Sequence, residues 1–198
     1  MAVLTLPHRI LRVMTPRRWI AWWIGLALFC PVVKAAPETA SISAEYQVKA
    51  VFLFNFAQFV EWPPRAFQKS NAPLIIAVLG EDPFGTYLDD LVRGEKVGDR
   101  PLLVRRYRHG DEPGDCHILF ICRSESRDID KLLAQLHDRS VLTVSDADTF
   151  TRQGGMVRFV TENGKIHMKI NVEAAKACNL TISSKILRPG TIATPAKD

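Results

Sequence analysis

The sequence predicts an α/β fold: a three-layer α/β/α sandwich with a mostly parallel sheet and a C-terminal antiparallel hairpin. Apolar runs at residues 74–79 and 118–121 predict buried strands of a parallel sheet, and the segment 141–144 predicts a further strand. Segments with helical spacing lie between these runs, and such alternation is typical of a parallel α/β core. Near the end of the chain, an Asn-Gly pair at 163–164 divides two strand-like runs and predicts the hairpin over residues 156–170.

The first expected element is a helix that begins near Glu45 and ends before the Pro-Pro pair at 63–64, because the residue before a proline avoids the helical conformation. Apolar residues recur at three- and four-residue steps, so we expect the face with Ala50, Phe54 and Ala57 to be buried. The opposite face is apolar too, and the helix therefore needs cover on more than one side, from its own domain or from a partner. That face carries Val51, Phe52, Phe56 and Phe59.

Two helices and one strand are expected in the middle of the chain. Asp82 is predicted to cap a helix over about 83–93, with a proline in its first turn. The segment 102–106 predicts a strand that is partly polar and therefore nearer an edge of the sheet. Asp128 is predicted to begin a helix that ends near His137, since its leucines and isoleucine share one face.

The last elements follow the hairpin. Asn171 is predicted to cap a short helix that runs to about Cys178. Asn179 can adopt the left-handed conformation that closes a helix. The apolar and β-branched residues of 181–187 predict a last strand.

Residues 1–35 have the pattern of a secretory signal peptide. Four arginines precede an apolar run over residues 19–33, and Val33 and Ala35 place small residues at the −3 and −1 positions of a cleavage site. The alternative is a retained membrane anchor, for which the apolar run is short of the roughly 20 residues that a bilayer requires. We therefore expect export and cleavage near Ala35.

The positive charge of the chain resides in this leader. The chain has 26 basic and 21 acidic residues; all five charged residues of the leader are basic, so the remainder is close to neutral. The basic balance reflects the export signal, and nucleic acid is not an expected partner. The remaining residues suffice for one domain with a core. We expect a flexible segment at 36–44, a single domain at 45–190 and a tail at 191–198.

Export would leave three cysteines: Cys116, Cys122 and Cys178. An odd number allows at most one internal disulfide. A straight strand between Cys116 and Cys122 spans about 20 Å, whereas bridged Cα atoms lie within about 7 Å, so these two cannot pair. A disulfide must therefore join Cys178 to Cys116 or Cys122. The alternative is that all three are small buried hydrophobic residues.

Ligands of open parallel sheets bind beyond the carboxyl ends of the strands. The loops expected there are residues 80–85, 122–126 and 145–148. They define a candidate ligand loop whose residues are Asp82, Phe84, Ser145 and Asp146.

Enzymatic and metal chemistry have less support. Asp82 and Asp146 would be the acid and base, with Ser124 or Cys122 as nucleophile, but both aspartates also suit caps and turns. The sequence has no Gly-x-Ser-x-Gly elbow, no phosphate-binding glycine loop, and no His-x-x-x-His or Cys-x-x-Cys pair. We therefore expect no catalytic residues, no metal and no cofactor.

Four ordered blocks of the sequence resemble the YfiR family of small periplasmic proteins. The first is the opening helix, Tyr-x-x-Lys-Ala-x-Phe-Leu-x-Asn-Phe-Ala-x-Phe-Val-Glu-Trp-Pro over residues 46–63. The others are residues 78–85, residues 141–146 with 154–156, and residues 170–171 followed by 183–188.

The resemblance implies a non-enzymatic periplasmic regulator. It would bind and repress the periplasmic sensory domain of an inner-membrane diguanylate cyclase, and so lower cyclic-di-GMP and biofilm formation. A sensor kinase is the other class of partner in the family, a homodimer is compatible with it, and contact with the membrane would be through the partner alone. Repression in the family depends on the late strands and their hairpin, which implies Val157, Phe159 and Lys169 as partner-binding residues.

The resemblance does not imply the redox-linked disulfides of the family for this chain, because the neighbourhood of Gly154-Gly155-Met156 lacks the cysteine pair of the best-known member.

The competing functions are a periplasmic small-ligand-binding protein that presents its ligand to a transporter or sensor kinase, and a periplasmic hydrolase. At about 163 residues without its leader, the chain is short for a two-lobed, hinge-closing binding protein.

Overall fold

The computed structural model describes residues 43–187 and 191–192. The predicted signal peptide with its cleavage site near Ala35 lies outside the described residues, as does most of the predicted tail. Within the described part of the chain, no helix is long and apolar enough to cross a membrane.

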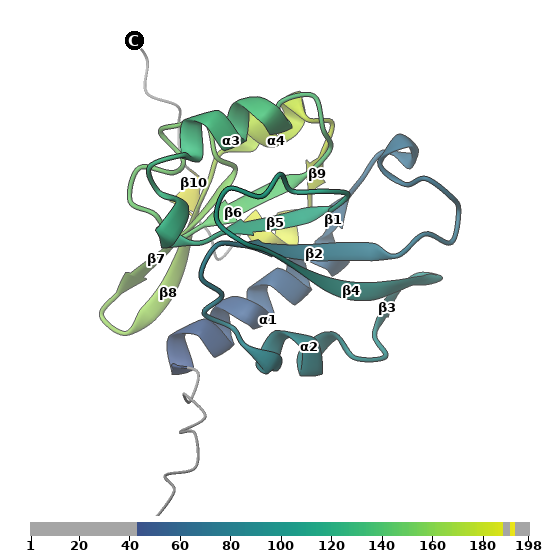
Figure 1. Ribbon diagram of the computed structural model, residues 1–198, viewed down its shortest axis with the longest axis horizontal. Coiled ribbons are helices and arrows are strands. Elements are labelled where there is room, and N and C mark those ends of the chain that lie inside the picture. Colours follow the sequence, from purple (N-terminus) through teal and green to yellow (C-terminus); the bar gives the residue numbers. More distant parts are fainter. Residues whose placement is uncertain (1–42, 188–190, 193–198) are drawn as a thin grey trace, which may run out of the picture. The chain divides into compact units, whose positions relative to one another are not determined.

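An eight-stranded sheet runs through the domain in the order β10-β8-β7-β6-β5-β2-β4-β3 (Figure 1). Five of its seven neighbouring strand pairs are parallel, and β3–β4 and β7–β8 are antiparallel. The α/β class, the mostly parallel sheet and the C-terminal hairpin are thus confirmed, whereas the division into three layers stays a prediction. The strands are β2 (Leu74–Leu79), β3 (Lys96–Val97), β4 (Arg100–Tyr107), β5 (Ile118–Ile121), β6 (Leu142–Ser145), β7 (Val157–Glu162), β8 (Lys165–Ile170) and β10 (Thr191–Ile192).

The central strands β2, β5 and β6 are buried along their whole length. The continuous apolar runs of β2 and β5 predict this burial, whereas β6 also buries two polar residues, Thr143 and Ser145. Successive side chains of a strand point to opposite faces of the sheet. In β2, Ile76 and Val78 enter a core with helices α1 (Ala44–Phe59) and α2 (Thr86–Val92), whereas Ala77 and Leu79 enter a second core with α3 (Ile129–Leu136). Helices therefore pack on both faces of this strand.

Helix α1 begins after Ser43 and ends at Phe59, before the two prolines. It ends early because Val60 and Glu61 form the short strand β1 (Val60–Glu61), which pairs antiparallel with β9 (Thr181–Ile182). A short 3-10 helix, η3 (Pro64–Ala66), follows at the prolines.

The buried face of α1 differs from the predicted one by one phenylalanine. Ala50 and Ala57 are buried as expected, together with Leu53, but Phe54 is only half-buried and Phe56 takes its place in the core. Phe56 stacks on Phe159 of β7 with ring centroids 6.1 Å apart. The prediction for Phe54 was wrong because Phe54 and Phe56 are separated by about 200° around a helix, and only the packing of β7 decides which is covered.

The predicted cap of the second helix was wrong. Helix α2 begins at Thr86, after Gly85, and not at Asp82. The Oδ1 atom of Asp82 instead accepts a hydrogen bond from the backbone N–H of Phe84 at 2.7 Å. A short side chain that bonds to the backbone two residues on forms a turn, and this turn delays the helix.

Helix α3 follows a second 3-10 helix, η4 (Arg123–Glu125), and Asp128 occupies its N-cap position without a side-chain capping bond. The hairpin is confirmed: Asn163 and Gly164 have φ values of 51° and 71°, as the tight turn between β7 and β8 requires. Helix α4 (Val172–Ala177) is capped by Asn171, whose Oδ1 accepts from the Ala174 N–H at 3.1 Å.

The last predicted strand was wrong in length. Asn179 does adopt the left-handed conformation, with φ of 59°, but only Thr181–Ile182 is extended. Residues Ser184–Leu187 form the short helix α5. The strand ends because Ser183 donates its backbone N–H to the Phe59 carbonyl and accepts the Lys185 N–H at its side chain, which turns the chain.

Candidate functional site

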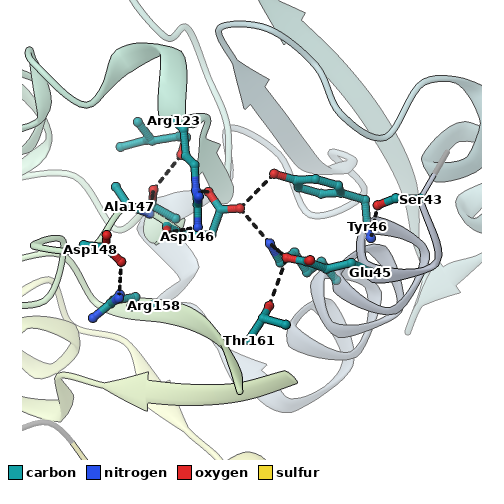
Figure 2. A network of polar contacts seen from close by, with 12 residues as sticks. Ser43, Glu45, Tyr46, Arg123, Asp146, Ala147, Asp148, Arg158 and Thr161 are labelled. Carbon is teal, nitrogen blue, oxygen red and sulfur yellow. Dashed lines mark hydrogen bonds and ion pairs between the residues drawn. The ribbon is translucent and has the colours of Figure 1, made fainter. Parts of the chain in front are cut away.

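The carboxyl ends of β5 and β6 meet the first turns of α1 in a network of polar side chains (Figure 2). Lys49, which is 1% exposed, donates to Oδ2 of Asp146 at 2.6 Å and also pairs with Glu45, one helical turn before it. The Tyr46 hydroxyl donates to the same oxygen of Asp146 at 2.9 Å. Glu45 in turn accepts a hydrogen bond from Thr161 of β7 at 2.9 Å. The network therefore ties α1 to two neighbouring strands of the sheet.

The other side of Asp146 faces Arg123, which follows β5. A guanidinium nitrogen of Arg123 donates to the backbone carbonyl of Asp146 at 3.2 Å, and its Nε lies 3.3 Å from Oδ1 of the same residue. Oδ1 is buried without a hydrogen bond of good geometry. Arg123 thus compensates the charge of Asp146 on the side away from α1.

These contacts fix the ionisation of two groups. Burial alone would raise the pKa of Asp146, but the hydrogen bonds and charges of Lys49, Tyr46 and Arg123 outweigh it and hold that pKa below its ordinary value. Burial, followed by the adjacent charge of Asp146, raises the pKa of Tyr46, so that its hydroxyl remains a donor. Asp146 is therefore an ionised, enclosed acceptor whose role here is structural.

The predicted ligand-loop residues come together only in part. Phe84 is fully buried and packs edge-on against Tyr46, with ring centroids 5.6 Å apart, so that it joins the Asp146 network. Ser145 is also fully buried, and its hydroxyl donates to the Ile121 carbonyl at 2.7 Å. Asp82 lies apart and pairs with Arg106 of β4 at 2.6 Å. Each predicted polar side chain thus has an internal partner.

Sequence reasoning missed Lys49 and Tyr46 as members of this network. The available signal was a lysine on an otherwise apolar helix face, three residues after a tyrosine, within the motif of the first helix. A buried lysine requires a charged partner. That partner is Asp146, but many other carboxylates lie between Lys49 and Asp146 in the sequence, so the sequence alone did not identify it.

The three predicted partner-binding residues lie on two faces of the hairpin. Val157 and Phe159 are each 1% exposed and point toward α1, where Phe159 contacts Phe56. Lys169 is half-buried and lies on the opposite face, directly across from Arg158. Val157 and Phe159 can therefore support a partner surface from behind but do not form it.

Cys116, Cys122 and Cys178 are buried free thiols, so the disulfide from Cys178 to Cys116 or Cys122 is not formed. Burial raises the pKa of Cys116 to about 11 and also raises the pKa values of Cys122 and Cys178. A protonated, enclosed thiol is a poor nucleophile, which weakens the role considered for Cys122. In the part of the chain that the structure describes, no cluster of histidine, cysteine and acidic side chains could hold a metal ion.

Together these features define an α/β domain whose most prominent polar side chains serve internal ion pairs and hydrogen bonds. The chain belongs to the YfiR/HmsC-like family, whose sequence profile matches residues 46–191. The match begins at Tyr46 of the polar network and reaches the last described strand, and it confirms the resemblance seen in the four sequence blocks. A search of the curated proteins gives no significant match.

Proposed function

We propose that the protein is a non-enzymatic periplasmic regulator that binds the periplasmic sensory domain of an inner-membrane diguanylate cyclase and holds it inactive. Cyclic-di-GMP and biofilm formation would fall as a result. Membership of the YfiR/HmsC-like family over residues 46–191 is the observation that carries the proposal. Repression requires only that the regulator bind the inactive conformation of its partner more tightly than the active one. A sensor kinase is the other class of partner that the family allows.

The surface proposed for the partner is the outer face of the β7–β8 hairpin. Directly opposed pairs share one face of an antiparallel ladder, and alternate pairs of this ladder point away from α1. The outward face of the hairpin has six residues: three are lysine or arginine, one is histidine and one is glutamate. This hairpin face consists of Arg158, Lys169, Val160, His167, Glu162 and Lys165.

Lys169 is the residue of this face on which we expect the partner to depend most. Arg158, which lies across from it, is already paired with Asp148. Lys169 has no ion pair with any residue that the structure describes. Complementary charge determines the choice of partner more than affinity, so an acidic patch on the cyclase is the expected complement.

The experiment compares Lys169→Glu with Lys96→Glu, which makes the same charge change on β3 at the other end of the sheet. Each tagged chain is used to capture partners from inner membranes, and cyclic-di-GMP is measured at equal protein abundance. We expect Lys169→Glu to lose the cyclase and raise cyclic-di-GMP, while Lys96→Glu behaves as the native chain and neither variant changes the melting temperature.

Each contrary outcome has its own meaning. Unaltered cyclic-di-GMP with Lys169→Glu would reject the hairpin face as the binding surface. Capture of neither a cyclase nor a kinase by the native chain would reject the regulatory function. A captured permease would favour a small-ligand-binding protein that serves a transporter.

A further inference from the structure

The connections between the parallel strands create a change of direction next to β2. From β2 the chain passes to β4 on one side, and it then crosses to β5 on the other side of β2. The connections that leave β2 and β5 therefore run in opposite directions from neighbouring strand ends. In open α/β sheets, ligands bind in the crevice at the carboxyl ends of such strands.

A cavity of about 880 Å³ lies at this position, within the size range of small-molecule sites. Three loops line it: Gly80 and Glu81 after β2, Arg108 and His109 after β4, and residues 123–128 after β5. We call it the switch-point cavity. It differs from the ligand loop predicted from the sequence, because Asp146 is enclosed in the network with α1 and the buried Ser145 hydroxyl bonds to the Ile121 carbonyl.

The loops that form the wall are packed directly on each other. Gly80 has φ of +99°, and a Cβ atom there would lie 2.3 Å from the Ser124 hydroxyl and 2.7 Å from a carboxylate oxygen of Glu125. Only glycine permits both this conformation and this approach. The Ser124 hydroxyl also accepts the Glu81 N–H at 3.0 Å. The cavity wall is therefore a built structure and not a gap between separate loops.

The buried acid of this wall is already paired. The side chain of Glu125 is 2% exposed, and its two oxygens contact Nδ1 of His109 at 2.7 Å and the Ser124 hydroxyl at 2.9 Å. Glu125 thus holds the β4 and β5 loops together, and both of its oxygens already have partners within the wall.

The remaining charged groups of the cavity have both signs. The side chains of Arg108 and Arg127 make no hydrogen bond or ion pair with any described residue, and neither do those of Glu81 and Asp128. Arg123 is partly committed to Asp146. A free guanidinium binds phosphate or carboxylate through two parallel hydrogen bonds, whereas a free carboxylate accepts hydrogen bonds from hydroxyl groups.

We propose that the switch-point cavity binds a small anion that also carries hydroxyl groups, such as a sugar phosphate or a sugar acid. Arg108 and Arg127 bind its phosphate or carboxylate, and Glu81 and Asp128 accept its hydroxyl groups. A simple anion would be repelled by the two carboxylates, and a neutral sugar would leave the two arginines unpaired. This proposal does not depend on the regulatory partner.

The test is a titration of the full chain with ribose 5-phosphate, gluconate, ribose and inorganic phosphate, followed by calorimetry and by amide chemical shifts. We expect ribose 5-phosphate or gluconate to bind at least tenfold more tightly than ribose or phosphate, with shifts at Gly80, Ser124 and Ser126. The double variant Arg108→Gln, Arg127→Gln should weaken that binding at least tenfold. Arg152→Gln, which removes an exposed arginine outside the cavity, should leave it unchanged.

Three results would overturn the proposal. They are the absence of binding by all four probes, shifts located away from the three loops, and equal weakening by the double variant and by Arg152→Gln. The chemical shifts of the native chain provide the answer even if a variant folds poorly. None of these results bears on capture of the cyclase, so the two proposals fail separately.

Discussion

Lys49 and Asp146 lie 97 residues apart in the sequence, yet their side chains meet at 2.6 Å between Nζ and Oδ2 in the interior of the domain. Each residue is 1% exposed. Removing two charges from water is costly, and their attraction compensates only when further hydrogen bonds satisfy both groups. Tyr46, Glu45 and Arg123 provide those contacts. The pair therefore fixes the position of α1 against the sheet.

Loss of one partner of this pair should be strongly destabilising. We expect Lys49→Met to lower the free energy of unfolding by about 3–5 kcal/mol, because it removes the buried cation that pairs with Asp146 and, among the described residues, leaves only the more distant, exposed Arg123 beside that charge. The double variant Lys49→Met, Asp146→Leu should recover much of that loss. Urea unfolding measures the stability of both variants. The control is Lys176→Met: Lys176 pairs with the exposed Glu173, so this variant should lose less than about 1 kcal/mol of stability. Equal losses for Lys49→Met and Lys176→Met would show that the buried pair is unimportant.

The two phenylalanines of α1 should differ in their contribution to stability. Phe56 is 1% exposed, so Phe56→Ala should cost about 3–5 kcal/mol through the cavity that it leaves. Phe54 is half-buried, and Phe54→Ala should cost less than about 2 kcal/mol. Urea unfolding of both variants decides the matter. A larger loss for Phe54→Ala would mean that the helix presents the face expected from its sequence alone.

Some parts of the fold could be predicted because their signals are local. The strand over residues 74–79 is apolar throughout. The Asn-Gly pair at 163–164 readily adopts the positive φ values that a two-residue hairpin turn requires. The end of α1 could not be predicted, because β1 exists only through its pairing with Thr181 and Ile182, about 120 residues later. Asp82 was misassigned because a cap and a turn use the same side-chain chemistry.

The site shows the same division between local and distant information. Asp146 was placed correctly beyond the end of a strand, but nothing near it in the sequence indicates that Lys49 encloses it. The hairpin was predicted, but Val157, Phe159 and Lys169 were grouped without a division between its two faces. The packing of the hairpin against α1 determines which of its faces is buried. Val157 and Phe159 lie on the buried face, and Lys169 lies on the other. Local patterns thus gave the elements, and distant contacts gave the roles of their side chains.

His117 should make the stability of the domain depend on pH between about 4 and 6.5. Its Nδ1 accepts the Ile75 N–H at 3.1 Å and its Nε2 lies 3.2 Å from the Ala66 carbonyl, so the neutral ring fits this position. Burial, with a smaller effect of Arg100, lowers the pKa of His117 to about 4. The folded chain then binds fewer protons than the unfolded chain in this range, and stability falls as the pH decreases through it.

The lowered pKa of His117 sets the size of this effect: the free energy of unfolding should fall by about 3 kcal/mol at most between pH 6.5 and pH 4. Urea unfolding at several pH values measures it, and His117→Gln should remove this part of the pH dependence. The matched control is His167→Gln, because His167 is exposed on β8. A native chain and a His117→Gln variant with parallel pH profiles would contradict the prediction.

The cysteines should react with thiol reagents only when the domain unfolds. Cys116, Cys122 and Cys178 are 6%, 3% and 8% exposed, and burial raises the pKa of each thiol, so both access and thiolate fraction are low. We expect each to be alkylated by iodoacetamide at least a hundredfold more slowly in the native chain than in urea, as measured by mass spectrometry of the separate peptides. Lys49→Met should increase the native rate, since a less stable domain opens more often. Rapid native labelling of Cys178 alone would place it on an accessible surface and reopen its role as a disulfide partner.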